Sequence, residues 1–357
     1  MSRARRASAA VVLMLACGVL AGCSRRVDFS ALRGQHPDTE AVDDTTLALA
    51  RDTQARWDAG AGDDAAQLNA RLLAHDLASH DADHWAARAR FVLDSLAFGA
   101  DIGDAPGVLL VNFFNRADPD QGAWPYLFWQ VDRKLRQQAL DGRGLHLDAV
   151  VSRGMAAGDP RPSAIAALFG KRAAGGQQPL LMIWTRPPGD GAWTLAQTLG
   201  ADSLGAMGSG DFVVRDTSVE LVTHTYQGTR GYEECASCPH VYRNRHFAWG
   251  PNGFAETAEA EVPSPYVSFV HFTQALSLGD YSLAARWAVD PSLVDRARRL
   301  EWGSGTRGSW RLAPDTDENA TEMVYFRGKE EAYRVQFTLR GTEWLIQNFD
   351  VTTRSVE

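Results

Sequence analysis

The chain has 357 residues, of which 45% are hydrophobic and 22% are charged, and its formal net charge is −8 at pH 7. The hydrophobic fraction is typical of a folded protein, and the length suggests two or three domains. The negative charge excludes an obvious nucleic-acid binder, because such proteins carry basic surfaces that face the phosphates. We therefore expect no nucleic-acid partner.

The first residues have the three parts of an export signal. Three arginines precede an apolar run at 9–21, which is too short to span a bilayer stably. The run ends in LAGC at residues 20–23, which resembles the lipobox of bacterial lipoproteins. The resemblance implies that residues 1–22 are a signal peptide and that Cys23 is acylated, for example with palmitate. Loss of the three arginines would change the net charge from −8 to −11.

Two other interpretations of the N-terminus stay open: an ordinary secretory signal cut near Ala21, and a cytosolic chain with an apolar start. The lipoprotein reading predicts a cell-envelope protein anchored to a membrane through its lipid. Ser24 resembles an outer-membrane sorting signal of Gram-negative lipoproteins, which would place the protein facing the periplasm. No later stretch reaches the length of a membrane span.

Polar residues 23–43 predict a flexible tether, and a helical segment follows at 44–100. Asp43 and Asp44 are suitable caps for a first helix that reaches Trp57. Leucines then recur at helical spacing for a second helix, and a third places apolar residues on one face before Gly99.

From 106 to 258 the apolar period changes to that of strands. We predict an antiparallel β-meander, either a sandwich or two to three propeller-like blades, without the fixed repeat of a full propeller. Residues 130–141 allow a helix as an alternative. The predicted strands cover 108–114, 126–131, 147–153, 164–170, 179–186, 193–199, 211–216, 219–226, 241–249 and 253–261.

Residues 262–357 change from helix to strands. The stretch F-x-x-A-L-x-x-G-D-Y-x-x-A-A at 272–285, followed by a meander that ends in W-x-I, resembles NTF2-like (cystatin-like) domains. The resemblance implies a curved sheet around helices with a conical pocket, for which the candidate residues are Tyr266, His271 and Tyr325. Members include enzymes, binding modules and scaffolds, so the fold names no activity. The fold class is thus α+β and multi-domain.

Three loops carry weak motif matches. The sequence GSGTRG at 303–308 fits G-x-G-x-x-G, but a helix precedes it and a strand follows, which is the reverse of a dinucleotide site. We expect a flexible loop there. The acidic loops at 117–122 and 315–319 lack the alternating oxygen ligands and the closing Glu of an EF-hand. We predict no cofactor.

The segment HDLASHDADH at 75–84 is rich in histidine. On one continuous helix, Asp76, His80 and His84 would share a face that suits zinc. The two aspartates that follow His80 are typical caps, however, and favour a solvated turn between two helices. We predict no metal site. The other candidate histidines stand in strand or helix patterns with no nucleophile beside them in sequence: His224, His246 and His271.

The sequence CASCPH places a C-x-x-C motif at Cys235 and Cys238. Pro239 occupies the position where c-type haem attachment needs histidine. Zinc would need two more ligands, of which His240 and His246 are the nearest. A redox pair needs a helix N-terminus, whereas strand patterns flank this motif. In an oxidising compartment we predict a disulfide that restrains the loop locally.

We predict a lipid-anchored, non-enzymatic binding or scaffolding protein, whose partners are other envelope proteins or a small molecule. One alternative is a small-molecule-binding or hydrolytic enzyme that uses the C-terminal pocket. Another is a thiol-redox or metal protein centred on Cys235 and Cys238. The sequence shows no catalytic residues. The loop residues predicted to face a partner are Tyr232, Glu233, Glu234 and His240.

Overall fold

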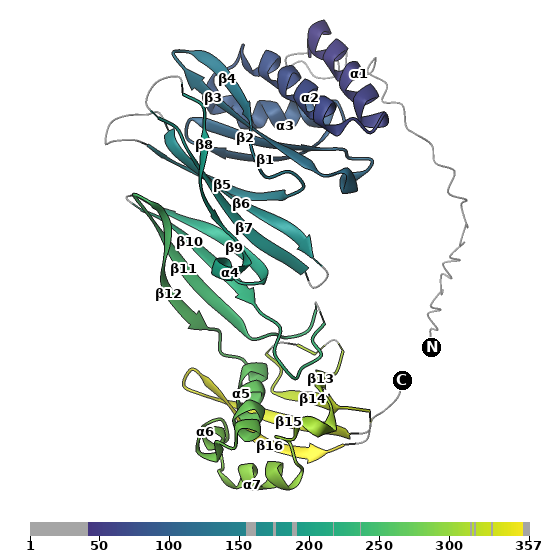
Figure 1. Cartoon of the computed structure of the whole chain (residues 1–357), viewed down its shortest axis with the longest axis vertical. Coiled ribbons are helices and arrows are strands. Elements are labelled where there is room, and N and C mark those ends of the chain that lie inside the picture. Colours follow the sequence, from purple (N-terminus) through teal and green to yellow (C-terminus); the bar gives the residue numbers. More distant parts are fainter. Residues whose placement is uncertain are drawn as a thin grey trace, which may run out of the picture. The chain divides into compact units, whose positions relative to one another are not determined.

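A computed structural model of the chain describes residues 42–352, apart from 155–161, 174–175, 188–190 and the single positions 217, 236, 315, 318 and 330. Cys23, the predicted signal peptide and nearly all of the predicted tether lie outside the described residues. Within the described part, no helix is long and apolar enough to cross a membrane. The described strands form four antiparallel sheets of four strands each (Figure 1).

Three helices open the described part and confirm the prediction: α1 (Asp44–Asp58), α2 (Gly62–Leu77) and α3 (Trp85–Ser95). The carboxylate of Asp43 caps α1 by accepting the backbone N–H of Thr46 at 2.7 Å. Trp57, on the buried face of α1, lies 5.3 Å between ring centres from Trp124 of the first sheet. Helices α2 and α3 contact the strands of the same sheet (Figure 1).

The first sheet contains β1 (Gly99–Ala105), β2 (Val108–Phe114), β3 (Ala123–Val131) and β4 (Lys134–Ala139). The helix allowed at 130–141 is therefore wrong. The chain turns from β3 into β4 through Asp132 and Arg133, whose φ angles are 48° and 61°. Two positive φ angles match a type I′ hairpin turn, which suits the twist of the strands and overrides the local helical pattern.

The second sheet contains β5 (His146–Gly154), β6 (Pro162–Ala173), β7 (Gly176–Thr185) and β8 (Thr194–Leu199), and its central strand β6 is buried on both faces over residues 164–170. Along β6, Ile165 and Phe169 pack with core residues of the first sheet. Ala166 and Leu168, on the opposite face, pack with the third sheet. Because both faces are covered, the sequence of β6 is a continuous apolar run and does not alternate between apolar and polar residues.

The third sheet contains β9 (Met207–Arg215), β10 (Ser218–Tyr226), β11 (Tyr242–Gly250) and β12 (Gly253–Glu261). A single turn of helix, α4 (Ala201–Leu204), precedes it. Leu221, Phe247 and Phe254 turn toward the second sheet. The predicted meander between 106 and 258 is thus three successive four-stranded sheets, joined by two separate hydrophobic cores.

The C-terminal part places helices before its sheet, as predicted. Its elements are α5 (Pro265–Leu278), α6 (Tyr281–Arg286), α7 (Ser292–Arg299), β13 (Trp310–Leu312), β14 (Glu322–Arg327), β15 (Glu331–Arg340) and β16 (Glu343–Val351). Ser264 caps α5, since its hydroxyl accepts the N–H of Val267 at 3.2 Å. Aromatic rings from the helices and the sheet fill one shared core, which includes Phe269 and Trp302.

Candidate functional site

The loop between β10 and β11, residues 227–241, docks against the C-terminal part, and we name it the clasp loop. Tyr232 forms a parallel bridge with Trp310 at the start of β13. The N–H of Trp310 donates to the carbonyl of Gly231 at 2.9 Å, and the N–H of Glu233 donates to the carbonyl of Trp310 at 2.8 Å. The clasp loop therefore extends the edge of the C-terminal sheet.

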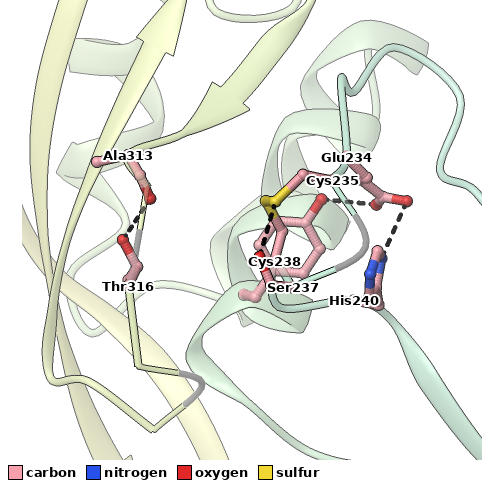
Figure 2. Close-up of a disulfide and its surroundings, with 8 residues drawn as sticks. Glu234, Cys235, Ser237, Cys238, His240, Ala313 and Thr316 are labelled. Carbon is pink, nitrogen blue, oxygen red and sulfur yellow. Dashed lines mark hydrogen bonds and ion pairs between the residues drawn. A yellow bond between two sulfur atoms is a disulfide. The ribbon is translucent and has the colours of Figure 1, made fainter. Parts of the chain in front are cut away.

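Glu234 is the polar centre of the clasp loop (Figure 2). Its side chain is 8% exposed and accepts the hydroxyl of Tyr266 at 2.7 Å and the N–H of Thr229 at 3.2 Å. The Nδ1 of His240, a side chain only 2% exposed, lies 3.3 Å from the same carboxylate. Burial raises the pKa of Glu234, but these hydrogen bonds outweigh burial and hold the pKa below its ordinary value of 4.5.

The structure confirms the predicted disulfide between Cys235 and Cys238, whose Cα atoms are 5.1 Å apart. Figure 2 shows it directly beside Glu234. With both sulfurs bonded to each other, neither is a thiolate nucleophile or a metal ligand in this state. The disulfide therefore restrains the clasp loop.

The four residues predicted to face a partner divide into two kinds. Tyr232, Glu234 and His240 turn inward and make the intramolecular contacts described above, whereas the side chain of Glu233 is exposed. The hydroxyl of Tyr232 bonds the hydroxyl of Thr273 on α5. Partner binding by this loop stays a prediction, and Glu233 is the member that the structure leaves accessible.

The three predicted pocket residues do not meet around one cavity. Tyr266 and Tyr325 belong to the packed aromatic core, where Tyr325 stacks on Phe269 with 3.7 Å between ring centres. Burial raises the pKa of both phenols, so both stay protonated. His271 lies apart from them, with its Nε2 2.7 Å from Glu261 and its ring stacked on Trp287.

A groove of about 560 Å³ lies where the clasp loop, α5 and the loop before β13 meet, and we name it the aromatic groove. Its lining combines aromatic rings with small polar residues. The lining residues used below are Arg230, Tyr232, Thr273, Gln274, Ser277, Leu278, Trp302, Ser304, Ser309 and Trp310.

Glycines allow the loop before β13 to lie against α5. A Cβ at Gly303 would lie 2.6 Å from the carbonyl oxygen of Leu276, so a larger residue would push the loop off the helix. Gly308 has a φ of 93°, which other residues adopt only with strain. The G-x-G-x-x-G stretch thus connects a helix to a strand, as predicted, and here it shapes a groove wall.

A second groove, of about 470 Å³, shares Arg230 and Gln274 with the aromatic groove, and we name it the polar groove. His271 and Glu261 line it. Arg243 and Arg245 also line it, and both guanidinium groups pair with Glu259. These four charged or titratable side chains are therefore paired within the chain, unlike Arg230.

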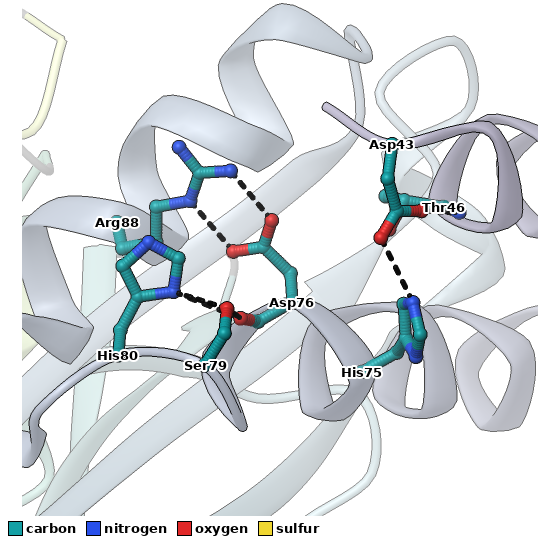
Figure 3. A network of polar contacts seen from close by, with 7 residues as sticks. All are labelled: Asp43, Thr46, His75, Asp76, Ser79, His80 and Arg88. Carbon is teal, nitrogen blue, oxygen red and sulfur yellow. Dashed lines mark hydrogen bonds and ion pairs between the residues drawn. The ribbon is translucent and has the colours of Figure 1, made fainter. Parts of the chain in front are cut away.

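In the histidine-rich segment at 75–84, His75, Asp76 and His80 each contact a different protein group (Figure 3). Asp76 binds Arg88 through two hydrogen bonds of 2.7 and 2.6 Å, and His75 pairs with Asp43 at 2.9 Å. The Nδ1 of His80 lies 2.9 Å from the carbonyl oxygen of Asp76. No group of three or more His, Cys, Asp or Glu suited to a metal occurs among the described residues.

His224 and His246 lie on the face of the third sheet that is turned away from its core. His224 stacks on Tyr242 with 4.2 Å between ring centres, and its Nδ1 lies 2.8 Å from the amide oxygen of Asn244. His246 lies 2.7 Å from Glu220. Each of the two thus has a structural partner on its own sheet.

Sequence reasoning missed most of the residues that build the aromatic groove, and of its lining it singled out only Tyr232 as a candidate site residue. Arg230, Gln274 and Trp302 come from a loop, a helix and a second loop, which no local motif connects. The one available signal was the glycine-rich stretch at 303–308 between two tryptophans.

No protein-family model and no curated protein matches the chain. Among solved structures, a lectin from Aleuria aurantia in complex with α-methyl-L-fucoside has 13% identity and a TM-score of 0.26, covering 72% of this chain and 61% of the lectin. A Bombyx mori GH32 β-fructofuranosidase has 10% identity and a TM-score of 0.23, covering 70% of this chain and 49% of the enzyme. The chain thus spans less than two thirds of either protein. Similarity at this level assigns neither fold nor ligand to it.

Proposed function

We propose that the chain is a lipid-anchored protein of the cell envelope that binds a small molecule without transforming it. The LAGC sequence at 20–23 supports the anchor at Cys23. The succession of three four-stranded meanders supports the propeller-like alternative for the central region. Three helices followed by a four-stranded antiparallel meander support an NTF2-like C-terminal domain.

The aromatic groove carries the binding proposal. Its volume of about 560 Å³ lies within the range of small-molecule sites, which are mostly apolar with a few placed polar groups. Trp302 and Trp310 belong to the C-terminal core and are 2% and 5% exposed, and they also line the groove, while Gln274 and nearby hydroxyls supply donors and acceptors. Leu278, 80% exposed, adds apolar surface at the rim.

The two alternatives have less support. A hydrolytic centre at Tyr266, His271 and Tyr325 would need these groups to converge, yet two of them lie in a filled core. A thiol centre would need free sulfurs, yet Cys235 and Cys238 are joined. The binding proposal instead rests on the aromatic groove, whose lining includes none of these five residues.

Titration with N-phenyl-1-naphthylamine, a neutral apolar fluorophore, tests the groove. The mature chain carrying Cys23→Ser avoids detergent that would compete for the probe. We expect saturable binding that Ser277→Trp abolishes, since position 277 lines the aromatic groove. The matched control Ser282→Trp changes an exposed serine on α6 and should bind normally. Equal binding by both variants would place the probe elsewhere and contradict the proposal.

The anchor has its own test. Cells fed labelled palmitate should incorporate the label into the wild-type chain but not into the Cys23→Ser variant. Labelling that survives the substitution would contradict acylation at this cysteine.

A further inference from the structure

Arg230 is the charged residue of the aromatic groove. Its side chain is exposed at the junction of the aromatic and polar grooves, and it makes no hydrogen bond or ion pair within the described part of the chain. Most other arginines near it are occupied: Arg243 and Arg245 pair with Glu259, and Arg327 donates to the carbonyl oxygen of Ser304. Arg230 is thus a cation available to a ligand.

The remaining described lining of the aromatic groove carries no formal charge. Trp302 and Trp310 lie 5.3 Å apart between ring centres and belong to the groove lining, although they are only 2% and 5% exposed, whereas Leu278 is 80% exposed. Such a surface favours an apolar body, because burial of apolar area is the main source of affinity there. It disfavours a charge placed deep in the groove, because desolvation would go uncompensated.

No carboxylate of the described residues forms an ion pair with Arg230, and Glu234 and Glu261 have partners of their own. Glu234 is saturated by Tyr266, His240 and the N–H of Thr229, and it points into the clasp loop. Glu261 pairs with His271 in the polar groove. An anionic group beside Arg230 would therefore gain a guanidinium partner, which presents several donors in a planar fork.

We propose that the aromatic groove binds a small amphiphilic anion, with its apolar body against Trp302, Trp310 and Leu278 and its anionic group on Arg230. This ligand class deepens the proposed function and rests on it. A carboxylate, a sulfonate or a phosphate suits this position, since all three accept hydrogen bonds from guanidinium.

Two fluorescent probes of similar apolar size separate charge from apolar contact: 1-anilinonaphthalene-8-sulfonate and neutral N-phenyl-1-naphthylamine. In the mature Cys23→Ser chain, we expect Arg230→Gln to weaken sulfonate binding about five- to tenfold, as expected for one charged hydrogen-bonding partner. Binding of the neutral probe should change less than about twofold. Arg51→Gln, which alters an exposed arginine of α1, should leave both affinities unchanged.

The outcomes separate the two proposals. If neither probe depends on Ser277→Trp, the groove is not a binding site and the proposed function fails. If both probes depend on Ser277→Trp but Arg230→Gln affects them equally, the groove binds and the anion assignment is overturned. Selective loss of the sulfonate in Arg230→Gln supports the proposal, and 0.5 M salt should weaken that probe selectively because ions screen the exposed charge.

Discussion

Asp76 and Glu234 are both buried carboxylates, but they are satisfied in different ways. Asp76, 5% exposed, receives two hydrogen bonds from the guanidinium of Arg88 across a helix–turn–helix (Figure 3). Glu234, 8% exposed, accepts hydrogen bonds from a tyrosine hydroxyl, a backbone N–H and a histidine ring nitrogen (Figure 2). Asp76 is therefore part of a buried ion pair. Glu234 accepts hydrogen bonds from several weaker donors, and we call this group of contacts the hub.

The difference follows from what each carboxylate joins. Asp76 and Arg88 lie 12 residues apart and hold α2 to α3 with a cation that is charged at every ordinary pH. Glu234 reaches Tyr266, 32 residues away, and so ties the third sheet to α5. The first contact stabilises the packing of two neighbouring helices. The second positions the clasp loop, whose residues line both grooves.

The largest loss of stability is expected when the ion pair between Asp76 and Arg88 is broken. Arg88→Met would leave Asp76 charged and buried without its partner, which costs about 3–5 kcal/mol of unfolding free energy. Urea unfolding monitored by circular dichroism measures it. Arg90→Met, an exposed position on the same helix, is the matched control and should be near neutral.

A second variant sharpens this result. Asp76→Leu combined with Arg88→Met removes both charges and should recover most of the lost stability, since apolar replacement of a buried pair is often neutral. A double variant as unstable as Arg88→Met alone would show that packing, not the uncompensated charge, causes the loss.

The next effect breaks the hub. Glu234→Leu leaves the hydroxyl of Tyr266 and the ring of His240 without their acceptor, at a cost of about 2–3 kcal/mol. The probe affinities of the aromatic groove should fall as well, because Gly231 and Tyr232 belong to its wall. Glu233→Leu, the exposed neighbour, should change neither property. Loss of stability with unchanged probe binding would separate the hub from the groove.

The disulfide should matter less. Replacing Cys235 and Cys238 with serine removes a disulfide that closes a ring of four residues. For so short a ring, the entropy lost by the unfolded chain limits the stabilisation to about 2 kcal/mol of unfolding free energy. The expected loss of unfolding free energy is therefore smaller than for Glu234→Leu, because the hub contacts persist. Thiol titration of the non-reduced wild type supplies the check: two freely reactive thiols would contradict the disulfide.

Much of the fold follows from sequence pattern because its elements are locally consistent. The apolar run of β6 and the turn-bounded strands on both sides predict the central sheets. β1 was not predicted, since GADIGDA has few strand-forming residues and depends on pairing with β2. At 130–141 two left-handed residues reversed the chain, a conformation that composition alone did not signal for Asp132 and Arg133.

The candidate site follows less from sequence, because long-range packing assembles it. The C-x-x-C motif and its disulfide were predicted from compartment and spacing. That Glu234 would turn inward to Tyr266, or that Arg230 would line the same groove as Gln274, depends on how the loop after β10 docks to α5. No periodicity in either segment encodes that contact.

The smallest expected effect is the pH dependence of the hub. The folded pKa of Glu234 lies below 4.5, so the folded state holds this proton less tightly than the unfolded chain. Its contribution is therefore complete above the unfolded pKa and is lost as pH falls through the folded value. In the difference in unfolding free energy between wild type and Glu234→Gln, the contributions of the other titrating groups cancel. Urea unfolding should show the stability gap narrowing below pH 4.5, and a gap that widens on acidification would mean that Glu234 is held in its protonated form.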